Sequence, residues 1–290
     1  MVCAQRLLKP RLDPLMARSL DESIVASSAF DTIAATYDDV FSESAIGRAQ
    51  RSVVWNEMYR VFHRGQRVLE INCGTGIDAI HLARRGIHVE ACDSASRMIA
   101  VAQRRAGTTD LPVRFRCLPI ESIDELAPAT PYDGILSNFS GLNCVANLNA
   151  VGRNLSRLVR PGGHIVLCVF GTFCLWEVLW YLSARDVHKA FRRLGRRGTE
   201  ASLGPSATVT VRYRTVNALK KLFKPHFRLE RRQGAGILVP PSYAASVVSR
   251  FPRMFRLAVE ADRFFGRCPF IRSLSDHAVL TFERVEEDGS

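Results

Sequence analysis

Short apolar runs alternate with segments of helical periodicity along the first 170 residues of the chain. The runs are brief, rich in Val, Ile and Leu, and bounded by turn residues, as buried parallel strands are. Between them, apolar residues recur every three or four positions, which predicts amphipathic helices. We predict strands at 67–71, 88–93, 113–118, 132–138 and 164–170, and helices at 77–86, 96–106 and 147–160.

The alternation of strands and helices indicates a Rossmann-like, doubly wound α/β fold, with helices on both faces of a mainly parallel, seven-stranded sheet. We expect a loosely ordered arm over residues 1–28 and a single domain over 29–290, with C-terminal cap (lid) insertions near 171–206 and 241–274. After Phe170 we predict helices at 174–194, 216–223 and 243–266, a Gly- and Arg-rich turn at 195–205, and strands at 208–213, 227–239 and 277–285.

The chain has a formal net charge of +12, and most of this excess lies in one segment. Residues 185–232 hold fourteen Lys or Arg against three acids. Such a block could attract nucleic acid, an anionic membrane surface or an acidic substrate. We favour a solvated face, because charge alone specifies no partner and the preference for Arg over Lys throughout the chain suggests a coding bias.

The eight cysteines form no C-x-x-C pair. Their spacing favours small buried thiols in a reducing compartment over a disulfide framework or a metal site. The longest apolar stretch, 166–182, is interrupted by Gly171 and Glu177, so it predicts a strand and a helix and no membrane span. The basic N-terminus lacks the apolar core of a signal peptide. We therefore expect a cytoplasmic protein without a bound metal.

The segment VLEINCGTGIDA at 68–79 carries the strongest chemical signal. Gly74 and Gly76 follow a predicted strand, where we expect them to let the backbone approach a ligand closely. Asp93 ends the next strand, where a carboxylate can accept hydrogen bonds from both hydroxyls of a ribose. The glycine spacing also satisfies a dinucleotide fingerprint, so an NAD-dependent oxidoreductase is the alternative of another class. Against it, Glu70 would repel a pyrophosphate but attract an ammonium group.

The pattern E-x-x-C-G-x-G resembles motif I of the class I S-adenosylmethionine-dependent methyltransferases, in their small-molecule branch. The likeness covers about residues 30–170: residues 30–41 resemble the family's N-terminal cap, 137–143 follow the strand that shapes the methyl-donor pocket, and 158–167 resemble its turn into the fifth strand. It implies S-adenosyl-L-methionine as cofactor. The implied contacts are Tyr37, Glu70, Asn72, Cys73, Gly74, Thr75, Gly76, Asp93, Ser94, Met98, Pro119, Ile120, Asn138 and Phe139.

Two positions depart from the family pattern. Pro119 stands where many relatives carry an Asp that pairs with adenine, which leaves that contact to backbone groups or to Glu121. Asn72 replaces a residue that is often Gly. Neither change prevents cofactor binding, but both leave the contacts at these points open.

The insertions are rich in large apolar side chains, which predicts a small apolar or aromatic acceptor. Trp176, Trp180 and Asn143 are the candidate substrate contacts. His277 follows Asp276, but adjacent residues of a strand point to opposite faces, so we do not expect catalysis by His277. We assign no catalytic residue, because methyl transfer mainly requires alignment. An RNA methyltransferase using residues 185–232 is the alternative, although no RNA-binding module signature is present. A non-catalytic cofactor-binding protein is a further alternative.

Overall fold

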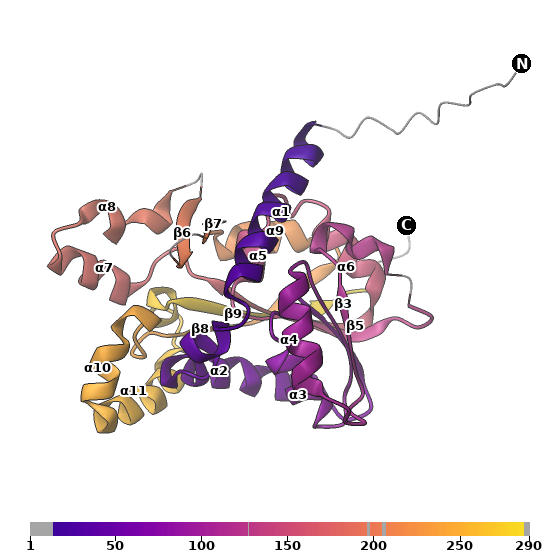
Figure 1. Ribbon diagram of the computed structural model, residues 1–290, viewed down its shortest axis with the longest axis horizontal. Helices are drawn as coiled ribbons and strands as arrows, with labels where there is room; N and C mark the ends of the chain where they lie inside the picture. Colours follow the sequence, from indigo (N-terminus) through magenta and orange to yellow (C-terminus); the bar gives the residue numbers. More distant parts are fainter. Residues whose placement is uncertain (1–13, 127, 196–197, 205–206, 287–290) are drawn as a thin grey trace, which may run out of the picture.

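The computed structural model describes residues 14–126, 128–195, 198–204 and 207–286. Within this part of the chain, a seven-stranded sheet runs in the order β3-β2-β1-β4-β5-β9-β8 (Figure 1). Its strands are β1 (Arg67–Ile71), β2 (His88–Asp93), β3 (Val113–Cys117), β4 (Tyr132–Ser137), β5 (Val159–Phe170), β8 (Phe227–Ala235) and β9 (His277–Arg284).

Six strands of the sheet run in the same direction, and only β9 is reversed, pairing antiparallel with both β5 and β8. The predicted mainly parallel, seven-stranded α/β fold is therefore confirmed. The order of the strands reverses between β1 and β4, which are neighbours in the sheet but not in the chain. A ligand of such a sheet binds outside the carboxyl ends of the strands at this switch point.

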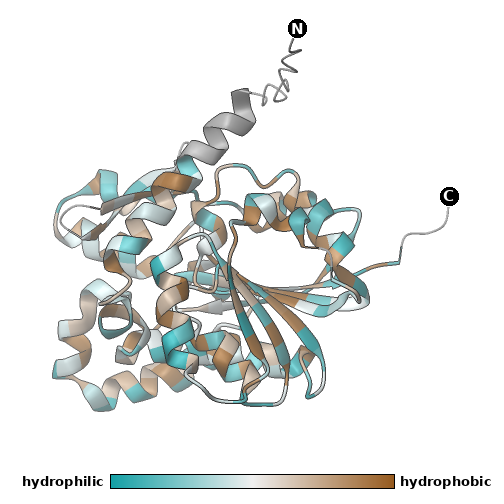
Figure 2. Ribbon diagram, turned by 45° about the vertical axis from the view of Figure 1, so that its right-hand side comes forward, coloured by the Kyte–Doolittle hydropathy of each residue, from teal (hydrophilic) through white to brown (hydrophobic). Residues whose placement is uncertain are grey.

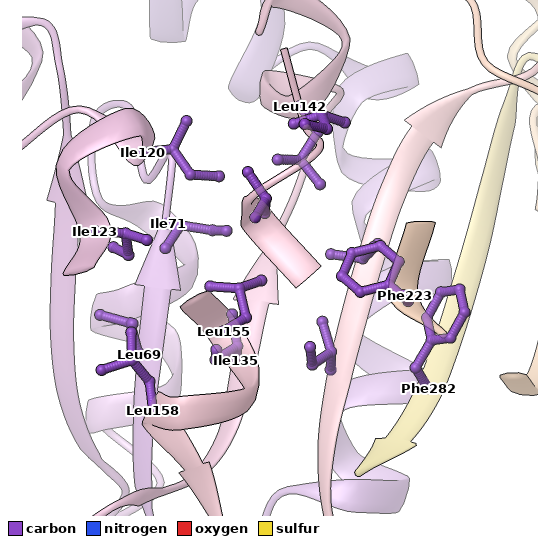
Figure 3. Close-up of a cluster of buried hydrophobic side chains, with 14 of the residues drawn as sticks. Leu69, Ile71, Ile120, Ile123, Ile135, Leu142, Leu155, Leu158, Phe223 and Phe282 are labelled. Atoms are coloured by element: carbon purple, nitrogen blue, oxygen red, sulfur yellow. The ribbon is translucent and has the colours of Figure 1, made fainter. Parts of the chain in front are cut away.

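Helices cover both faces of the sheet because each strand presents apolar side chains to both sides. On one face, Leu69 and Ile135 pack against α6 and α9, and Figure 3 shows this cluster, including Phe223 and Phe282. On the other face, Val68 packs against α2, α3 and α4. These helices are α2 (Ala45–Val61), α3 (Ile77–Ala83), α4 (Ser96–Ala106), α6 (Val151–Leu158) and α9 (Val216–Phe223), with short turns at α5 (Gly141–Cys144) and η2 (Ile120–Glu125).

The two C-terminal insertions form a lobe beside the sheet (Figures 1 and 2). The single helix predicted at 174–194 is broken at Arg185, whose φ is +58°. The helix predicted at 243–266 breaks at Phe251, because the following Pro252 disfavours the helical conformation there. Instead of the predicted turn, residues after 198 form a hairpin. The elements are α7 (Leu175–Ser183), α8 (Val187–Ala190), η3 (Arg192–Leu194), β6 (Thr199–Gly204), β7 (Ala207–Val211), η4 (Ser242–Ala244), α10 (Ala245–Arg250), α11 (Pro252–Phe265) and η5 (Ile271–Leu274).

The N-terminal segment is helical where a loosely ordered arm was predicted. Helix α1 (Pro14–Ile33) packs against α4 and the β6–β7 hairpin, and residues 1–13 lie outside the described residues. Asp31 fixes the helix by accepting a hydrogen bond of 2.7 Å from the backbone N–H of Arg97. A π-helical turn, η1 (Asp38–Ser42), then leads into α2. Among the described helices none has the length and apolarity to cross a membrane.

Candidate functional site

The loop between β1 and α3 turns through three residues with positive φ: Asn72 at +56°, Gly74 at +53° and Gly76 at +73°. A Cβ on Gly74 would have no protein atom within 4 Å, so this glycine faces open space. A Cβ on Gly76 would lie 2.7 Å from the ring of Phe115 and 2.8 Å from Ala102. The missing Cβ of Gly76 therefore permits close packing of the loop on β3 and α4, whereas the missing Cβ of Gly74 leaves room on the open side of the loop.

Glu70, at the end of β1, is only 1% exposed. The backbone N–H of Ala79 in α3 donates to its carboxylate, which ties the loop to the strand. Its second oxygen, Oε2, is buried without a hydrogen-bond partner among the described residues. Burial, reinforced by the charge of Asp78, raises the pKa of Glu70 well above its ordinary value. The carboxylate thus lacks a cationic or hydrogen-bonding partner on one side.

Asp93, at the end of β2, joins two backbone segments. Its Oδ2 accepts from the N–H of Gly74 at 2.8 Å, and its Oδ1 accepts from the N–H of Ala95 at 2.9 Å. Burial raises its pKa despite these two bonds. Each oxygen keeps a further lone pair, so the carboxylate can hold the loop and accept bonds from a ligand at the same time.

A cavity with about 850 Å³ of space, its open mouth included, surrounds these groups at the carboxyl ends of β1, β2 and β4. Most predicted cofactor contacts line it, although Gly76 and Pro119 do not. Pro119 instead precedes η2, and its neighbour Ile120 reaches the cavity. The predicted residues that line it are Tyr37, Glu70, Asn72, Cys73, Gly74, Thr75, Asp93, Ser94, Met98, Ile120, Asn138 and Phe139.

Sequence reasoning missed the contribution of α1 to this cavity. Ser23, Ala26 and Phe30 line it, and Ser23 donates a hydrogen bond of 3.2 Å to Glu121. Burial raises the pKa of Glu121, whose role the sequence left open and which lines the same end of the cavity as Ile120. The apolar residues of α1 are spread around the helix, so it lacks the strong amphipathic pattern that would have predicted a docked helix.

A buried ion pair between Arg51 of α2 and Asp78 of α3 forms another wall that was not predicted. Trp55 Nε1 donates to Asp78 at 2.6 Å, and Asn138 Nδ2 donates at 2.8 Å. The guanidinium of Arg51 lies 4.5 Å from the centre of the Phe139 ring. The predicted residue Asn138 is therefore engaged in fixing the wall, and its neighbour Phe139 lies at the turn that closes it.

The turn after β4 separates this first cavity from a second one. Phe139 and Ser140 adopt positive φ values of +44° and +65°, a conformation that L-residues rarely take. Phe139, together with Tyr37 and Cys144, lines both cavities. Burial raises the pKa of Tyr37 to about 12, although the charge of Arg51 opposes this. The strained turn thus places one aromatic ring as the common wall of two neighbouring cavities.

The second cavity has about 1570 Å³ of space, its mouth included, and lies between the sheet edge and the insertions. Its walls are largely apolar and aromatic, and both insertions and the hairpin contribute to them. The apolar residues that define it are Phe30, Ile33, Val40, Phe41, Phe139, Phe170, Leu203, Val209, Val211, Tyr213 and Tyr243.

A cluster of charged side chains forms one end of the second cavity. Arg193 donates to Glu177 at 2.8 Å and to Asp276 at 2.6 Å, and all three are buried. Burial opposes the charge of Asp276, but His277 and Arg193 outweigh it and hold its pKa well below its ordinary value. Nδ1 of His277 lies 3.3 Å from Asp276 Oδ2. The expectation that these neighbours point apart is wrong, because Asp276 precedes the first residue of β9 and so lies outside the alternation of the strand.

The predicted substrate contacts lie outside both cavities. Trp180 is 40% exposed and packs on Tyr243, with ring centroids 5.6 Å apart, so it lies behind the wall of the second cavity. Trp176 belongs to the same helix and lines neither cavity. Asn143 ties β5 to the segment after β7: its Oδ1 accepts from Phe170 N and its Nδ2 donates to Arg212 O. We therefore find a structural role for Asn143.

The basic segment 185–232 is largely engaged within the fold. Arg192 and Arg193 pair with Glu177, and Arg231 pairs with Glu57. Arg214 donates to three backbone carbonyls of the turn after β4. The described residues contain no group of three or more His, Cys, Asp or Glu that could hold a metal ion. Arg192, Arg193, Arg214 and Arg231 thus serve packing within the fold.

Three comparisons place the chain among known proteins. Residues 68–163 match the family model of a methyltransferase domain. The chain is 29% identical over 146 residues to a demethylmenaquinone methyltransferase of Clavibacter sepedonicus, a match that covers 50% of this chain and 58% of that protein. It is 28% identical over 175 residues to a ubiquinone biosynthesis O-methyltransferase of Chromobacterium violaceum, covering 54% and 73% of the two chains. The match thus spans a little over half of the first relative's length.

Among solved structures, a 1,6-didemethyltoxoflavin-N1-methyltransferase of Burkholderia thailandensis has the same fold. Its TM-score is 0.55 at 20% identity, and the match covers 92% of this chain and 91% of that chain. The family match favours the methyltransferase prediction over the oxidoreductase alternative. Residues 68–163 therefore resemble a methyltransferase domain, and the chain shares the fold of solved S-adenosylmethionine-dependent methyltransferases.

Proposed function

We propose that the protein transfers a methyl group from S-adenosyl-L-methionine, bound in the first cavity, to a small acceptor with an apolar body, bound in the second. The observation that carries this proposal is the shared wall: Tyr37, Phe139 and Cys144 line both cavities. A methyl donor and an acceptor must meet in line at close distance, and contiguous cavities provide that alignment.

The residues of the first cavity fit the cofactor. The unpartnered Oε2 of Glu70 can accept a bond from the ammonium of the methionine part, and Asp93 can accept from the ribose hydroxyls. The open space beside Gly74 allows the ligand to lie against the loop. Glu121, which accepts from Ser23 of α1 and lines the same cavity, can accept from an adenine amino group. The bound cofactor supplies an activated methyl group, while these residues hold and orient it.

The second cavity supports an apolar or aromatic acceptor. Its aromatic walls can pack against the faces of a flat ring system, and its charged end limits polar contacts to one part of the ligand. The similar proteins include a demethylmenaquinone methyltransferase and a ubiquinone biosynthesis O-methyltransferase, and both names refer to quinones. An RNA acceptor is less favoured, because much of the basic segment is paired inside the fold.

We also propose peripheral contact between the insertion lobe and a membrane surface. Helix α11 packs Phe255 and Val259 inward, yet on its other side Leu257 is 73% exposed and Phe264 is 69% exposed. Arg253 stands near this stripe and has no ion-pair partner in the described part of the chain. Exposed apolar side chains beside cations suit an anionic lipid surface, from which an apolar acceptor could enter beside Tyr243. The free, buried thiols of Cys92 and Cys168 support a location in the reducing cytoplasm.

Calorimetry with S-adenosylmethionine, S-adenosylhomocysteine, NAD and NADP tests the cofactor assignment. We expect the first two to bind and the dinucleotides to give no heat. A second assay incubates the protein with labelled methyl donor and either an apolar metabolite extract or purified tRNA and rRNA. We expect label in the extract. Tight NAD binding without a response to S-adenosylmethionine would refute the cofactor assignment, and label confined to RNA would refute the acceptor class.

A further inference from the structure

The second cavity contains two buried polar groups that nothing in the fold uses fully. Ser140 is 3% exposed, and its Oγ has no hydrogen-bond partner among the described residues. His277 is also 3% exposed, and its imidazole lines the cavity with Nδ1 turned to Asp276, 3.3 Å from Oδ2. Buried polar atoms are rarely left unsatisfied, so the unpartnered Oγ of Ser140 points to a polar group of a ligand at this end of the cavity.

These two groups lie next to the wall shared with the first cavity. Ser140 follows Phe139 directly, and its N–H donates to Cys168 O at 2.8 Å, which fixes the turn on β5. The His277 ring meets the edge of the Phe139 ring at a centroid distance of 5.8 Å and stacks on Phe170 at 4.7 Å. The imidazole is therefore immobilised beside the ring that faces both cavities.

The carboxylate of Asp276 is held ionised beside this imidazole. Its Oδ1 accepts from Arg193 at 2.6 Å, and its Oδ2 accepts from Gln50 at 3.3 Å. A fixed carboxylate next to an imidazole favours the tautomer with the proton on Nδ1, which leaves Nε2 free to accept another proton. It also stabilises the imidazolium that results. Two cations lie over the rings that pack on this imidazole: Arg193 is 5.3 Å from the centre of the Phe170 ring, and Arg51 is 4.5 Å from that of Phe139.

We propose that His277 is the general base of the reaction and that the acceptor is an aromatic hydroxyl, a phenol or hydroquinone, whose oxygen lies between His277 and Ser140. This inference rests on the proposed function and specifies its acceptor atom. The hydroxyl proton goes to Nε2 of His277, the oxygen forms the new bond to the methyl carbon, and the electron pair of the broken carbon–sulfur bond stays on sulfur. The imidazolium later returns its proton to water.

The chemistry of the groups favours a phenol over an aliphatic alcohol. Ordinary phenol and imidazole pKa values are about 3.5 apart, a gap small enough for transfer of the proton during methylation. The flat walls formed by Phe139, Phe170 and Tyr213 suit an aromatic ring. A neutral amine can attack the methyl group with its lone pair and needs to lose a proton only after methyl transfer. A buried imidazole–carboxylate pair is therefore better suited to a hydroxyl acceptor than to an amine.

The test compares wild type with His277→Gln, and uses His63→Gln as a control because His63 is an exposed histidine outside both cavities. The acceptors are 1-naphthol, which stays protonated at pH 8, and 4-nitrocatechol, which ionises readily. We expect His277→Gln to lower kcat/KM for 1-naphthol by about 10²- to 10³-fold and for 4-nitrocatechol by less than about fivefold. Ser140→Gly, which relieves the positive φ and removes the hydroxyl, should raise KM by about three- to tenfold.

A spectroscopic measurement tests the base without turnover. The ionisation of 4-nitrocatechol can be followed by absorbance in the complex with S-adenosylhomocysteine. We expect its bound pKa to be at least about one unit lower in wild type than in His277→Gln. Equal values, equal losses for both acceptors, failure to bind 4-nitrocatechol, or transfer only to amine or carbon acceptors would overturn the proposal. Failure of wild type to bind S-adenosylhomocysteine would instead refute the proposed function.

Discussion

Replacing Glu70 by Gln should separate two opposite effects of one buried carboxylate. In the free protein the charged form is disfavoured, since burial and the charge of Asp78 raise the Glu70 pKa well above its ordinary value. With a cationic ligand the same charge becomes favourable, because Oε2 gains its missing partner. The variant keeps the size of the side chain and an oxygen that can accept from Ala79 N, but it offers no charge to an ammonium group.

The size of the loss follows from one charge-assisted hydrogen bond at a side chain that is 1% exposed. Such a bond contributes about 1.5–3 kcal/mol, which corresponds to a dissociation constant for S-adenosylhomocysteine about 10- to 150-fold higher. Calorimetry at pH 7.5 measures it directly. Glu57→Gln is the matched control: Glu57 is buried too, but its partners Thr281, Arg60 and Arg231 all belong to the protein. It should lower stability without changing ligand affinity.

The pH dependence of stability and of ligand affinity gives a second, independent test of the role of Glu70. A raised pKa means that the folded protein holds a proton that the unfolded chain has released, so the contribution of Glu70 to stability is present below pH 4.5 and is lost as pH rises above it. Binding of a cation favours the carboxylate and releases that proton, so affinity should rise with pH in this window. The pKa of Asp93 is raised too, and Asp93 is present in both proteins. The difference in the pH dependence of affinity between wild type and Glu70→Gln therefore reports the titration of Glu70 alone. Equal affinity of both proteins at every pH would refute this reasoning.

Two further substitutions test the packing of the loop and the lobe. Gly76→Ala should lower the free energy of unfolding by about 2–4 kcal/mol, because the new Cβ meets Phe115 at 2.7 Å in a left-handed backbone conformation. Gly65 has a similar φ but open space around its Cβ position, so Gly65→Ala should lower the free energy of unfolding by only about 1 kcal/mol. Urea denaturation of both variants measures the two losses. Phe264→Ser should weaken binding to phosphatidylglycerol vesicles about fivefold or more in sedimentation assays. Ile24 is similarly exposed but lies on α1, outside the insertion lobe, so Ile24→Ser should leave vesicle binding unchanged. Equal effects within either pair would contradict the corresponding interpretation.

The order of strands and helices could be predicted because the core of this fold leaves a local signal. Buried parallel strands are short apolar runs, and β1 pairs with β2 and β4 through backbone hydrogen bonds between such runs. Helix α2 was missed because its buried face contains Gln50, Arg51 and Glu57 among apolar residues, which hides the hydrophobic period. These polar residues are buried because they bind partners far away in the sequence, and such pairing leaves no local pattern.

Some residues of the candidate site could likewise be predicted from local sequence, and others could not. Glu70 and Asp93 could be predicted, since each follows a strand at a fixed distance from the glycine loop. The pair of Asp276 and His277 could not, because its geometry depends on where β9 begins and on Arg193, which lies 83 residues earlier. Trp180 of α7 packs on Tyr243 and lines neither cavity, and an aromatic pattern alone does not distinguish packing from a binding wall.

The distribution of charge relates the two cavities to one reaction. Four carboxylates, Glu70, Asp78, Asp93 and Glu121, line the first cavity, and Arg51 is paired with Asp78. This surplus of carboxylates favours a ligand that carries positive charge, as the sulfonium and ammonium of S-adenosylmethionine do. Methyl transfer removes the sulfonium charge, so the attraction for the product is weaker. In the proposed reaction a positive charge appears instead on His277, where the fixed carboxylate of Asp276 already faces it. Each cavity thus places a carboxylate where positive charge is present at one stage of the reaction, and Tyr37, Phe139 and Cys144 form the wall they share.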